Sequence, residues 1–356
     1  MHTRTRSHRH SLTGLAALGV LLLTSCSGDD AAADSEDGAS GEASYGALEI
    51  PLSWVKTWEF AGMYFAEDSG YYEEAGFESV NLISGGPSAT PAATQLVTGD
   101  NLAAMSNPID TASLIEAEGE DAPVKIIGSV FQQNAFSIFS LAENPAEEPS
   151  DLEGMTVGVA PGNEPAFYAF LEVNDIDEED VEVVSIQGDA GGLLTGEFDA
   201  SIGFATNQAT AIELEGAEVV NMMLADHGLP FAGGSIVTTE ENIEENRDEL
   251  KAFLEATIRG WQDALNDPEA GVEMTVEDHG ADQGLDPEHQ RLTAERQMEL
   301  MTNEWTDENG LLTMSDDAVD DTLEAVEAVG YELPDDIFDM TLINEVYEEN
   351  PDLLEY

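Results

Sequence analysis

Short apolar runs alternate with amphipathic stretches along the first part of the chain. The apolar runs predict strands at residues 47–52, 79–83, 102–105, 124–130 and 135–141. The stretches between them predict helices at residues 61–75, 91–98 and 110–118. Strands that alternate with helices in this way indicate βαβ units and a mainly parallel sheet. We assign residues 47–141 to the first part of one lobe.

The same alternation begins again after residues 143–150, a Pro- and Glu-rich stretch that is typical of a crossing between two units. Strands are predicted at residues 155–159, 181–186, 200–202 and 218–222. Helical segments are predicted at residues 165–173, 190–195 and 207–214. This repeat of the plan indicates a second lobe at residues 142–232.

The chain is then expected to return to the first lobe, which takes in residues 233–356. The β-rich segment 235–238 is predicted to join the first sheet. Residues 243–266 follow the period of an amphipathic helix, with Leu250, Phe253, Leu254, Thr257, Ile258, Trp261 and Leu265 on one face. The prediction is an α/β protein of two lobes, with helices on both faces of its sheets. Crossings near Ala142 and Ala232 join the lobes, and strand ends from both lobes meet in a cleft.

The first residues have the pattern of a secretory signal. Three arginines and no acid precede the apolar stretch 12–23, which is shorter than the roughly 20 residues that span a bilayer as a helix. The stretch ends in Leu23-Thr24-Ser25-Cys26, the pattern of a bacterial lipobox. We predict a signal peptide at residues 1–25 and acylation of Cys26, the only cysteine in the sequence. The alternative is a cysteine without function in a cleaved signal.

A tether is predicted to follow the acylated cysteine. Residues 27–44 contain no large apolar side chain and many acids, which is typical of a disordered segment. Residues 26–46 would then link two or more acyl chains to the folded part. We therefore expect a monomer on the extracytoplasmic face of the cell membrane, held there by lipid alone.

Acidic side chains dominate the composition. The chain has 75 Asp and Glu against 10 Lys and Arg, and its formal net charge is −65. Such a surface repels nucleic acid, so none is expected as a partner. The acids are spread over loops and helix faces, as in proteins adapted to high salt, and form no calcium-loop pattern. His227, His279 and His289 lack metal-ligand spacing, and we expect neither a metal nor a cofactor.

Five segments resemble one family in their order and spacing. They are WVKTWEFAGMYFAEDSGYYEEAG at 54–76, the Gly85-Gly86-Pro87 loop, DLEGMTVGV at 151–159, LTGEFDA at 194–200 and FLEATIRGWQDAL at 253–265. Together they resemble binding proteins of the superfamily that takes up thiamine precursors, riboflavin, alkanesulfonates and nitrate. The resemblance implies the type II periplasmic-binding-protein fold. It also implies a solute-binding role beside the permease and the ATPase of an ABC importer.

Two segments favour one branch of that superfamily. Residues 59–62 and 206–208 look most like members that bind aromatic heterocycles, either pyrimidine precursors of thiamine or riboflavin. The thiamine-pyrimidine synthases of the superfamily carry a Cys-rich motif and a histidine in the first loop, where this chain has Phe60. No nucleophile–base pair is visible either, so an enzyme is not expected.

The loop after the first predicted strand offers aromatic and charged candidates. Trp54 and Trp58 can stack on a planar ligand, although packing at the start of a helix is the alternative for each. Glu59 can accept a hydrogen bond from a ligand amine, or lie on the surface like most of the acids. Lys56 can meet an anion, or remain solvated.

Further candidates follow other predicted strands. Gly86, Pro87 and Ser88 are predicted ligand contacts, because backbone N–H groups of the loop 85–88 can bind a ligand oxygen, unless this loop is only a tight turn. Asn163 can cap a helix, form hydrogen bonds with a ring edge, or do both. The remaining predicted ligand contacts are Asn107, Gln132 (or its neighbour Gln133), Glu164, Phe204 and Asn207.

The main alternative keeps the fold and changes the ligand to a small anion, such as an alkanesulfonate, taurine or nitrate. That ligand favours a basic cleft, yet only Lys56 and Lys125 lie between Ser53 and Ala232. A purely structural or adhesive lipoprotein is a third alternative, and it would need no cleft.

Overall fold

This computed structural model describes residues 44–86, 89–119, 122–160, 163–187 and 190–355. The fold described is that of the unit Glu42–Tyr356. The signal peptide, Cys26 and nearly all of the tether lie outside the described residues, as do Pro87 and Ser88. The first strand begins at Tyr45, inside the stretch assigned to the tether.

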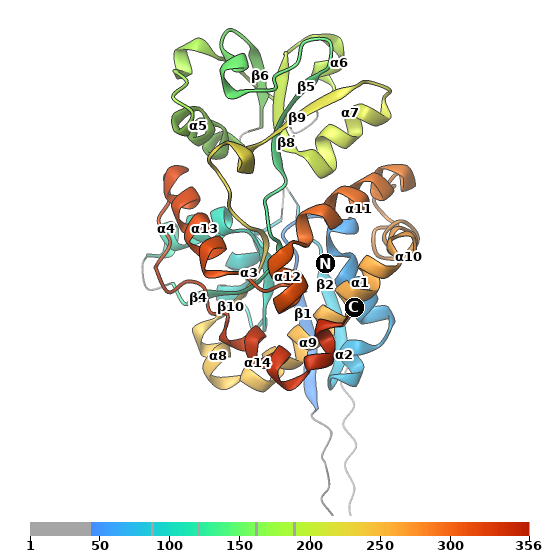
Figure 1. Cartoon of the computed structure of the whole chain (residues 1–356). Coiled ribbons are helices and arrows are strands. Elements are labelled where there is room, and N and C mark those ends of the chain that lie inside the picture. Colours follow the sequence, from blue (N-terminus) through green and yellow to red (C-terminus); the bar gives the residue numbers. More distant parts are fainter. Residues whose placement is uncertain (1–43, 87–88, 120–121, 161–162, 188–189, 356) are drawn as a thin grey trace, which may run out of the picture. The chain divides into compact units, whose positions relative to one another are not determined.

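Lobe I contains two small sheets, which lie in the lower half of Figure 1. β1 (Tyr45–Pro51) pairs in parallel with β2 (Phe77–Ile83). β10 (Gly233–Thr239) lies between β3 (Ala104–Ser106) and β4 (Val124–Phe131) and runs antiparallel to both. β1 contacts β3, so the two sheets are neighbours.

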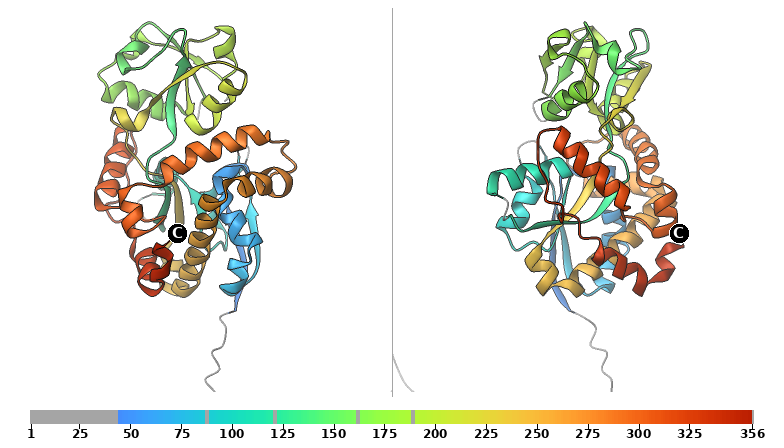
Figure 2. Two further views of the ribbon diagram at one scale, coloured as in Figure 1. Left: turned by 45° about the vertical axis from the view of Figure 1, so that its right-hand side comes forward. Right: turned by 60° about the vertical axis from the view of Figure 1, so that its left-hand side comes forward.

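Helices surround these sheets (Figures 1 and 2). The predicted helix 61–75 is interrupted at Gly70, whose φ of 77° lies in the left-handed region that glycine adopts without strain. In lobe I, the helices before β10 are η1 (Trp58–Phe60), α1 (Ala61–Asp68), α2 (Tyr71–Glu74), α3 (Ala92–Thr98) and α4 (Pro108–Glu118). Those after it are α8 (Glu240–Glu245), α9 (Arg247–Asn266), α10 (Pro268–Glu273), η7 (Met274–His279), α11 (Pro287–Met301), α12 (Glu304–Asn309), α13 (Asp316–Ala328), α14 (Thr341–Glu349) and η8 (Pro351–Leu354).

Lobe II is built on one five-stranded sheet with the order β7-β6-β8-β5-β9. Its strands are β5 (Phe136–Leu141), β6 (Thr156–Val159), β7 (Glu182–Ser185), β8 (Ala200–Phe204) and β9 (Val219–Met223). Helical segments η2 (Pro149–Leu152), α5 (Glu164–Val173), η4 (Glu178–Asp180), α6 (Gly192–Thr195), η5 (Ala205–Ala209), α7 (Thr210–Leu214) and η6 (Leu224–His227) connect them.

The strand pairing is mixed rather than mainly parallel. β6 runs parallel to β7 and β8, whereas β5 runs antiparallel to β8 and β9. The antiparallel strands β5 and β10 are the two that follow a change of lobe. They enter their sheets from the other lobe rather than through a βαβ connection, which explains their opposite direction.

The first crossing lies earlier than the sequence indicated. β5 belongs to the second sheet, so the chain changes lobe at residues 132–135 and not near Ala142. The Pro- and Glu-rich stretch is a connection inside lobe II, where the N–H of Ala146 donates to the Ser140 hydroxyl at 2.8 Å. The apolar run 135–141 was misassigned because its pattern does not reveal which sheet it joins.

The core of lobe I depends on a close crossing of α1 and α9. A Cβ atom at Gly260 would lie 2.0 Å from the Gly62 carbonyl oxygen, and one at Gly62 would lie 2.2 Å from the Trp261 ring. Trp261 in turn packs edge-on against Trp58, with ring centroids 6.1 Å apart. Only glycine permits this approach, because any side chain would push the helices apart.

We predict that Gly260→Ala destabilises the protein by about 3 kcal/mol or more, because the added methyl group overlaps backbone atoms. Urea denaturation followed by circular dichroism measures the loss. Gly46→Ala is the matched control, since a Cβ atom at Gly46 would meet nothing within 4 Å. Equal stabilities of the two variants would contradict the close-crossing argument.

Candidate functional site

Loops at the carboxyl ends of strands in both lobes carry the predicted site residues. In lobe I, Trp54, Gly86 and Asn107 follow β1, β2 and β3. In lobe II, Asn163 and Asn207 follow β6 and β8. Binding sites of α/β proteins form outside the carboxyl ends of strands. The candidates are far apart in the sequence, but all of them lie at this kind of position.

Trp54 presents its ring to solvent, and a glycine holds the loop that carries it. The side chain of Trp54 is 36% exposed. Gly85 donates its N–H to the Trp54 carbonyl at 2.9 Å, and a Cβ atom at Gly85 would lie 2.3 Å from the Leu52 carbonyl oxygen. The loops after β1 and β2 therefore pack backbone to backbone. Gly86 has a φ of 129°, which favours glycine.

Trp58 lies in the core of lobe I, where its ring is not accessible for stacking on a ligand. Its side chain is fully buried, and its indole N–H donates to the Pro268 carbonyl at 3.3 Å. Packing at the helix start, the alternative considered for this residue, describes it correctly. The ring is held by Trp261, which lies far along the chain and left no signal in the local pattern.

Glu59 is a half-buried carboxylate without a cation. Burial raises the pKa of Glu59 to about 7, and a hydrogen bond with Ser53 offsets part of that rise. Among the described side chains of Lys, Arg and His, none forms an ion pair with it. An acid with such a pKa either donates or accepts a hydrogen bond near neutral pH.

Two candidates of lobe I bond to protein groups. Asn107 caps α4: its side-chain oxygen accepts from the Asp110 N–H at 2.9 Å, and its amide donates to the Asp110 carboxylate at 2.7 Å. Gln132 donates its side-chain amide to the Thr313 carbonyl at 3.0 Å. These bonds fix both side chains, and both remain partly exposed, as does Gln133.

Asn163 and Glu164 start α5 in lobe II. Asn163 occupies the N-cap position, but its side chain makes no capping bond and instead donates to the Ile202 carbonyl at 3.3 Å. The expected capping role is therefore wrong, and the amide ties the loop after β6 to β8. Glu164 is the first residue of α5 and is half-buried.

Phe204 and Asn207 lie where β8 passes into the π-helical turn η5. The Phe204 ring meets the Phe136 ring edge to face, with centroids 4.6 Å apart. The carbonyl oxygen of Asn207 lies 3.1 Å from Nε2 of His289, a histidine that is isolated in the sequence and was not predicted as a site residue. The one sequence signal for that contact is the helical spacing of His289, Thr293 and Arg296 on α11.

Lys56 differs from the other cations of the described chain. Lys125, Arg247, Lys251, Arg259, Arg291 and Arg296 all form ion pairs with Asp or Glu. Lys56 forms none among the described residues. Instead it lines a hollow of about 450 Å³ together with Val55, Asn81, Leu82, Ile83, Ser84, His279, Asp282 and Gln283. This hollow adjoins the loops that carry Trp54 and Gly85.

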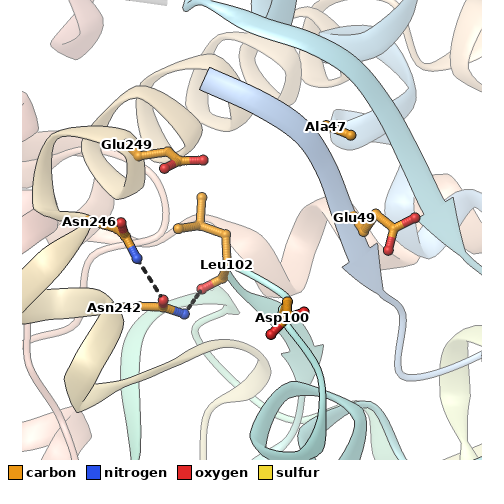
Figure 3. A pocket seen from close by; sticks show the side chains of 7 residues that line it. All are labelled: Ala47, Glu49, Asp100, Leu102, Asn242, Asn246 and Glu249. Atoms are coloured by element: carbon orange, nitrogen blue, oxygen red, sulfur yellow. Dashed lines mark hydrogen bonds between the residues drawn. The ribbon is translucent and has the colours of Figure 1, made fainter. Parts of the chain in front are cut away.

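A second hollow, of about 320 Å³, lies at the opposite ends of the strands (Figure 3). Its lining includes Ala47 and Glu49 near the start of β1 and Asp100 and Leu102 just before β3. Asn246 donates its side-chain amide to Asn242, which donates to the Leu102 carbonyl at 2.9 Å. The hollow is therefore separate from the loops that carry the site candidates.

The described residues also bear on metals and membranes. Among them, no three His, Cys, Asp or Glu side chains are grouped so that they could hold a metal ion. No helix in the same part of the chain combines the length and the apolar character that crossing a bilayer requires.

A family model described as NMT1/THI5-like matches residues 57–271. The riboflavin-binding protein RibY of Chloroflexus aurantiacus is 26% identical over 307 residues, which cover 83% of this chain and 86% of that protein. The formylaminopyrimidine-binding protein of Halalkalibacterium halodurans is 25% identical over 264 residues, which cover 73% of this chain and 76% of that protein.

Solved structures share the fold at lower identity. The periplasmic aliphatic sulphonate binding protein SsuA of Escherichia coli has 14% identity and a TM-score of 0.61, with 80% of this chain and 91% of that chain covered. The desulfurization enzyme DSZB has 15% identity and a TM-score of 0.58, with 85% and 99% covered. The periplasmic-binding-protein fold that the sequence predicted is thereby confirmed.

We predict that Glu59→Gln removes a pH-dependent loss of stability. The pKa of Glu59 is raised in the folded protein, so the folded state holds its proton more tightly than the unfolded state. Stability then falls as pH rises from the ordinary glutamate range to about 7, and the variant should lack this decline.

The difference in unfolding free energy between wild type and Glu59→Gln should change by on the order of 1 kcal/mol across that window, because partial exposure weakens the effect. Urea titrations at pH 4.5, 6 and 8 measure it. The exposed Glu244→Gln serves as the control. Parallel pH profiles for wild type and Glu59→Gln would contradict a raised pKa of Glu59 in the folded protein.

Proposed function

Because the chain belongs to the NMT1/THI5-like family, we propose that it is a solute-binding protein that captures a flat heterocycle for an ABC importer. A ring of the riboflavin or aminopyrimidine kind is the favoured ligand. The observation that carries this choice is the exposed ring of Trp54, five residues before Glu59, whose carboxylate forms no ion pair among the described residues.

The two side chains suit the two parts of such a ligand. An exposed indole offers a face for stacking, and each such contact adds about 1 kcal/mol beyond the burial of apolar surface. A carboxyl group with a pKa of about 7 bonds a ring amine when charged or a ring nitrogen when protonated. The two sequence relatives are a riboflavin-binding and a formylaminopyrimidine-binding protein, which supports the same class of ligand.

A small anion is the second candidate ligand, and Lys56 favours it. Lys56 forms no ion pair among the described residues, and the chain shares its fold with an aliphatic sulphonate binding protein. One cation in so acidic a chain supplies little attraction for a free anion. We therefore rank the anion below the heterocycle.

Capture would proceed by closure of the lobes over the ligand. Loops of both lobes carry candidate contacts, namely Trp54 and Glu59 in lobe I and Asn163, Glu164, Phe204 and Asn207 in lobe II. The crossings at residues 132–135 and 224–232 are the hinge in this proposal. A ligand that contacts both lobes favours the closed form, which the permease can distinguish from the open form.

Binding without chemistry is part of the proposal. Residues 44–355 contain no cysteine to act as a nucleophile, and both named sequence relatives are binding proteins. The fold alone does not decide this point, because DSZB is an enzyme of the same fold. Acylation of Cys26 would hold the protein, as a monomer, to the outer face of the membrane beside the permease and its ATPase.

We predict a rise in melting temperature with riboflavin or an aminopyrimidine, because a ligand that binds only the native state stabilises it. Thermal-shift titrations in high salt would compare these compounds with taurine and nitrate. A shift only with taurine or nitrate would replace the heterocycle by an anion. Ligand recovered intact by mass spectrometry after long incubation is expected, and a converted product would contradict binding without chemistry.

We predict that Trp54→Ala weakens heterocycle binding about tenfold, because a stacking contact and its buried surface are lost. Trp54→Phe should keep most of the affinity. Trp305→Ala is the control, since Trp305 is similarly exposed, at 38%, on α12. Isothermal titration calorimetry gives the three affinities, and an unchanged affinity in Trp54→Ala would exclude stacking on this ring.

A further inference from the structure

The helix α11 contacts the site loops of both lobes. It appears in orange in Figures 1 and 2, and it packs against η1 and β4 of lobe I and against η5 and α7 of lobe II. η1 carries Glu59, and η5 carries Asn207. A rigid helix therefore lies in contact with both halves of the proposed site.

A continuous chain of hydrogen bonds crosses α11 from one loop to the other. The N–H of Trp58 donates to the Gln290 side-chain oxygen at 2.9 Å, and the Gln290 amide lies 3.2 Å from Nδ1 of His289. Nε2 of His289 lies 3.1 Å from the Asn207 carbonyl. A carbonyl can only accept, so Nε2 carries the proton and Nδ1 accepts from Gln290. One neutral tautomer of His289 satisfies both contacts.

The lobe II side of the helix is held by two more residues. Thr293 donates its hydroxyl to the Thr206 carbonyl at 2.7 Å, and Arg296 donates to the Ala205 carbonyl at 2.9 Å. With His289, these side chains bind the three successive carbonyls of residues 205, 206 and 207. Their spacing places all three on one face of α11.

Arg296 also forms an ion pair between the lobes. It also donates to the Thr210 hydroxyl at 2.5 Å and to the Glu213 carboxylate on α7. The lobe I side is anchored by Gln297, which donates to the Glu59 carbonyl at 3.2 Å, and by Gln290. Both glutamines are about 99% buried, with 1% exposed, so they are fixed parts of lobe I.

We propose that α11 is a brace that sets the position of lobe II relative to lobe I, with His289, Thr293 and Arg296 as its positioning residues. Any movement that separates η5 from α11 must break these bonds together. The brace thereby couples the loop of Glu59 to the loop of Asn207. The brace acts in the protein without ligand, so it does not depend on which molecule the protein binds.

The distance between the lobes tests the brace directly. The full chain has one cysteine, so Cys26→Ser combined with Glu179→Cys in lobe II and Glu244→Cys in lobe I gives a single spin-labelled pair. Electron–electron double resonance on ligand-free protein then reports the interlobe distance. Glu179 and Glu244 are exposed and lie outside the proposed site.

We predict that Thr293→Val combined with Arg296→Gln shifts or broadens the distance distribution by more than about 2 Å. Thr293→Ser alone should keep the wild-type distribution, because the hydroxyl donor remains. Arg291→Gln is the matched control: Arg291 lies on the same helix, but its ion pairs with Glu269 and Glu288 stay within lobe I.

An unchanged distribution in the double variant would overturn the proposal. So would an equal change in Arg291→Gln, because it would mean that any lost charge on α11 has the effect. Should the double variant fail to fold by circular dichroism, Arg296→Gln alone gives the test with the same expected direction and the same overturning result.

Discussion

The side-chain amide of Asn134 joins the two crossings, and the two-lobed arrangement depends on it. Its amide donates to the carbonyls of Leu229 and Phe231, at 2.9 and 3.2 Å, and its oxygen accepts from the Phe136 N–H. Asn134 is 2% exposed, so an unsatisfied amide there would be costly. Because both crossings are bound at one point, β5 and β10 enter their sheets from the same place. The N–H of Ala205, directly after β8, donates to the Ala135 carbonyl at 2.9 Å, so the loop after β8 is anchored to the first crossing.

The few cations of this acidic chain occupy junctions between elements. Arg247 and Lys251 join α9 to α14, Arg259 joins α9 to α2, and Lys125 joins β4 to α8. Each exposed pair contributes at most about 1 kcal/mol, and salt weakens it. Their positions matter more than their strength, since each pair brings together segments far apart in sequence. Arg296 likewise joins distant segments, since its ion pair with Glu213 connects α11 to α7 of the other lobe. Lys56 differs, because it forms no ion pair among the described residues and lies near the proposed site.

Periodicity along the chain predicted most strands and helices, because burial of one face is a local property of a segment. It failed where the answer depended on distant partners. The apolar run 135–141 reads the same in either sheet, and only pairing with β8 and β9 assigns it to lobe II. Trp54 and Trp58 share one loop, and Trp261 decides which of them is buried. Asn163 has a capping residue type at a cap position, yet the Ile202 carbonyl takes its amide.

The contacts of α11 could not be predicted from the sequence for a further reason. Most residues of α11 are polar, and glutamines such as Gln290 and Gln297 usually lie at the surface. Both are nevertheless buried here. Buried amides require partners, and here the partners are backbone groups of η1, whose own geometry is set by the buried Trp58. The turn η1, which carries Glu59, and the π-helical turn η5, which carries Asn207, are therefore both positioned by one helix. A ligand that contacts both loops would bind two segments that α11 already connects. A change in the relative position of the lobes would therefore also change the geometry of the site.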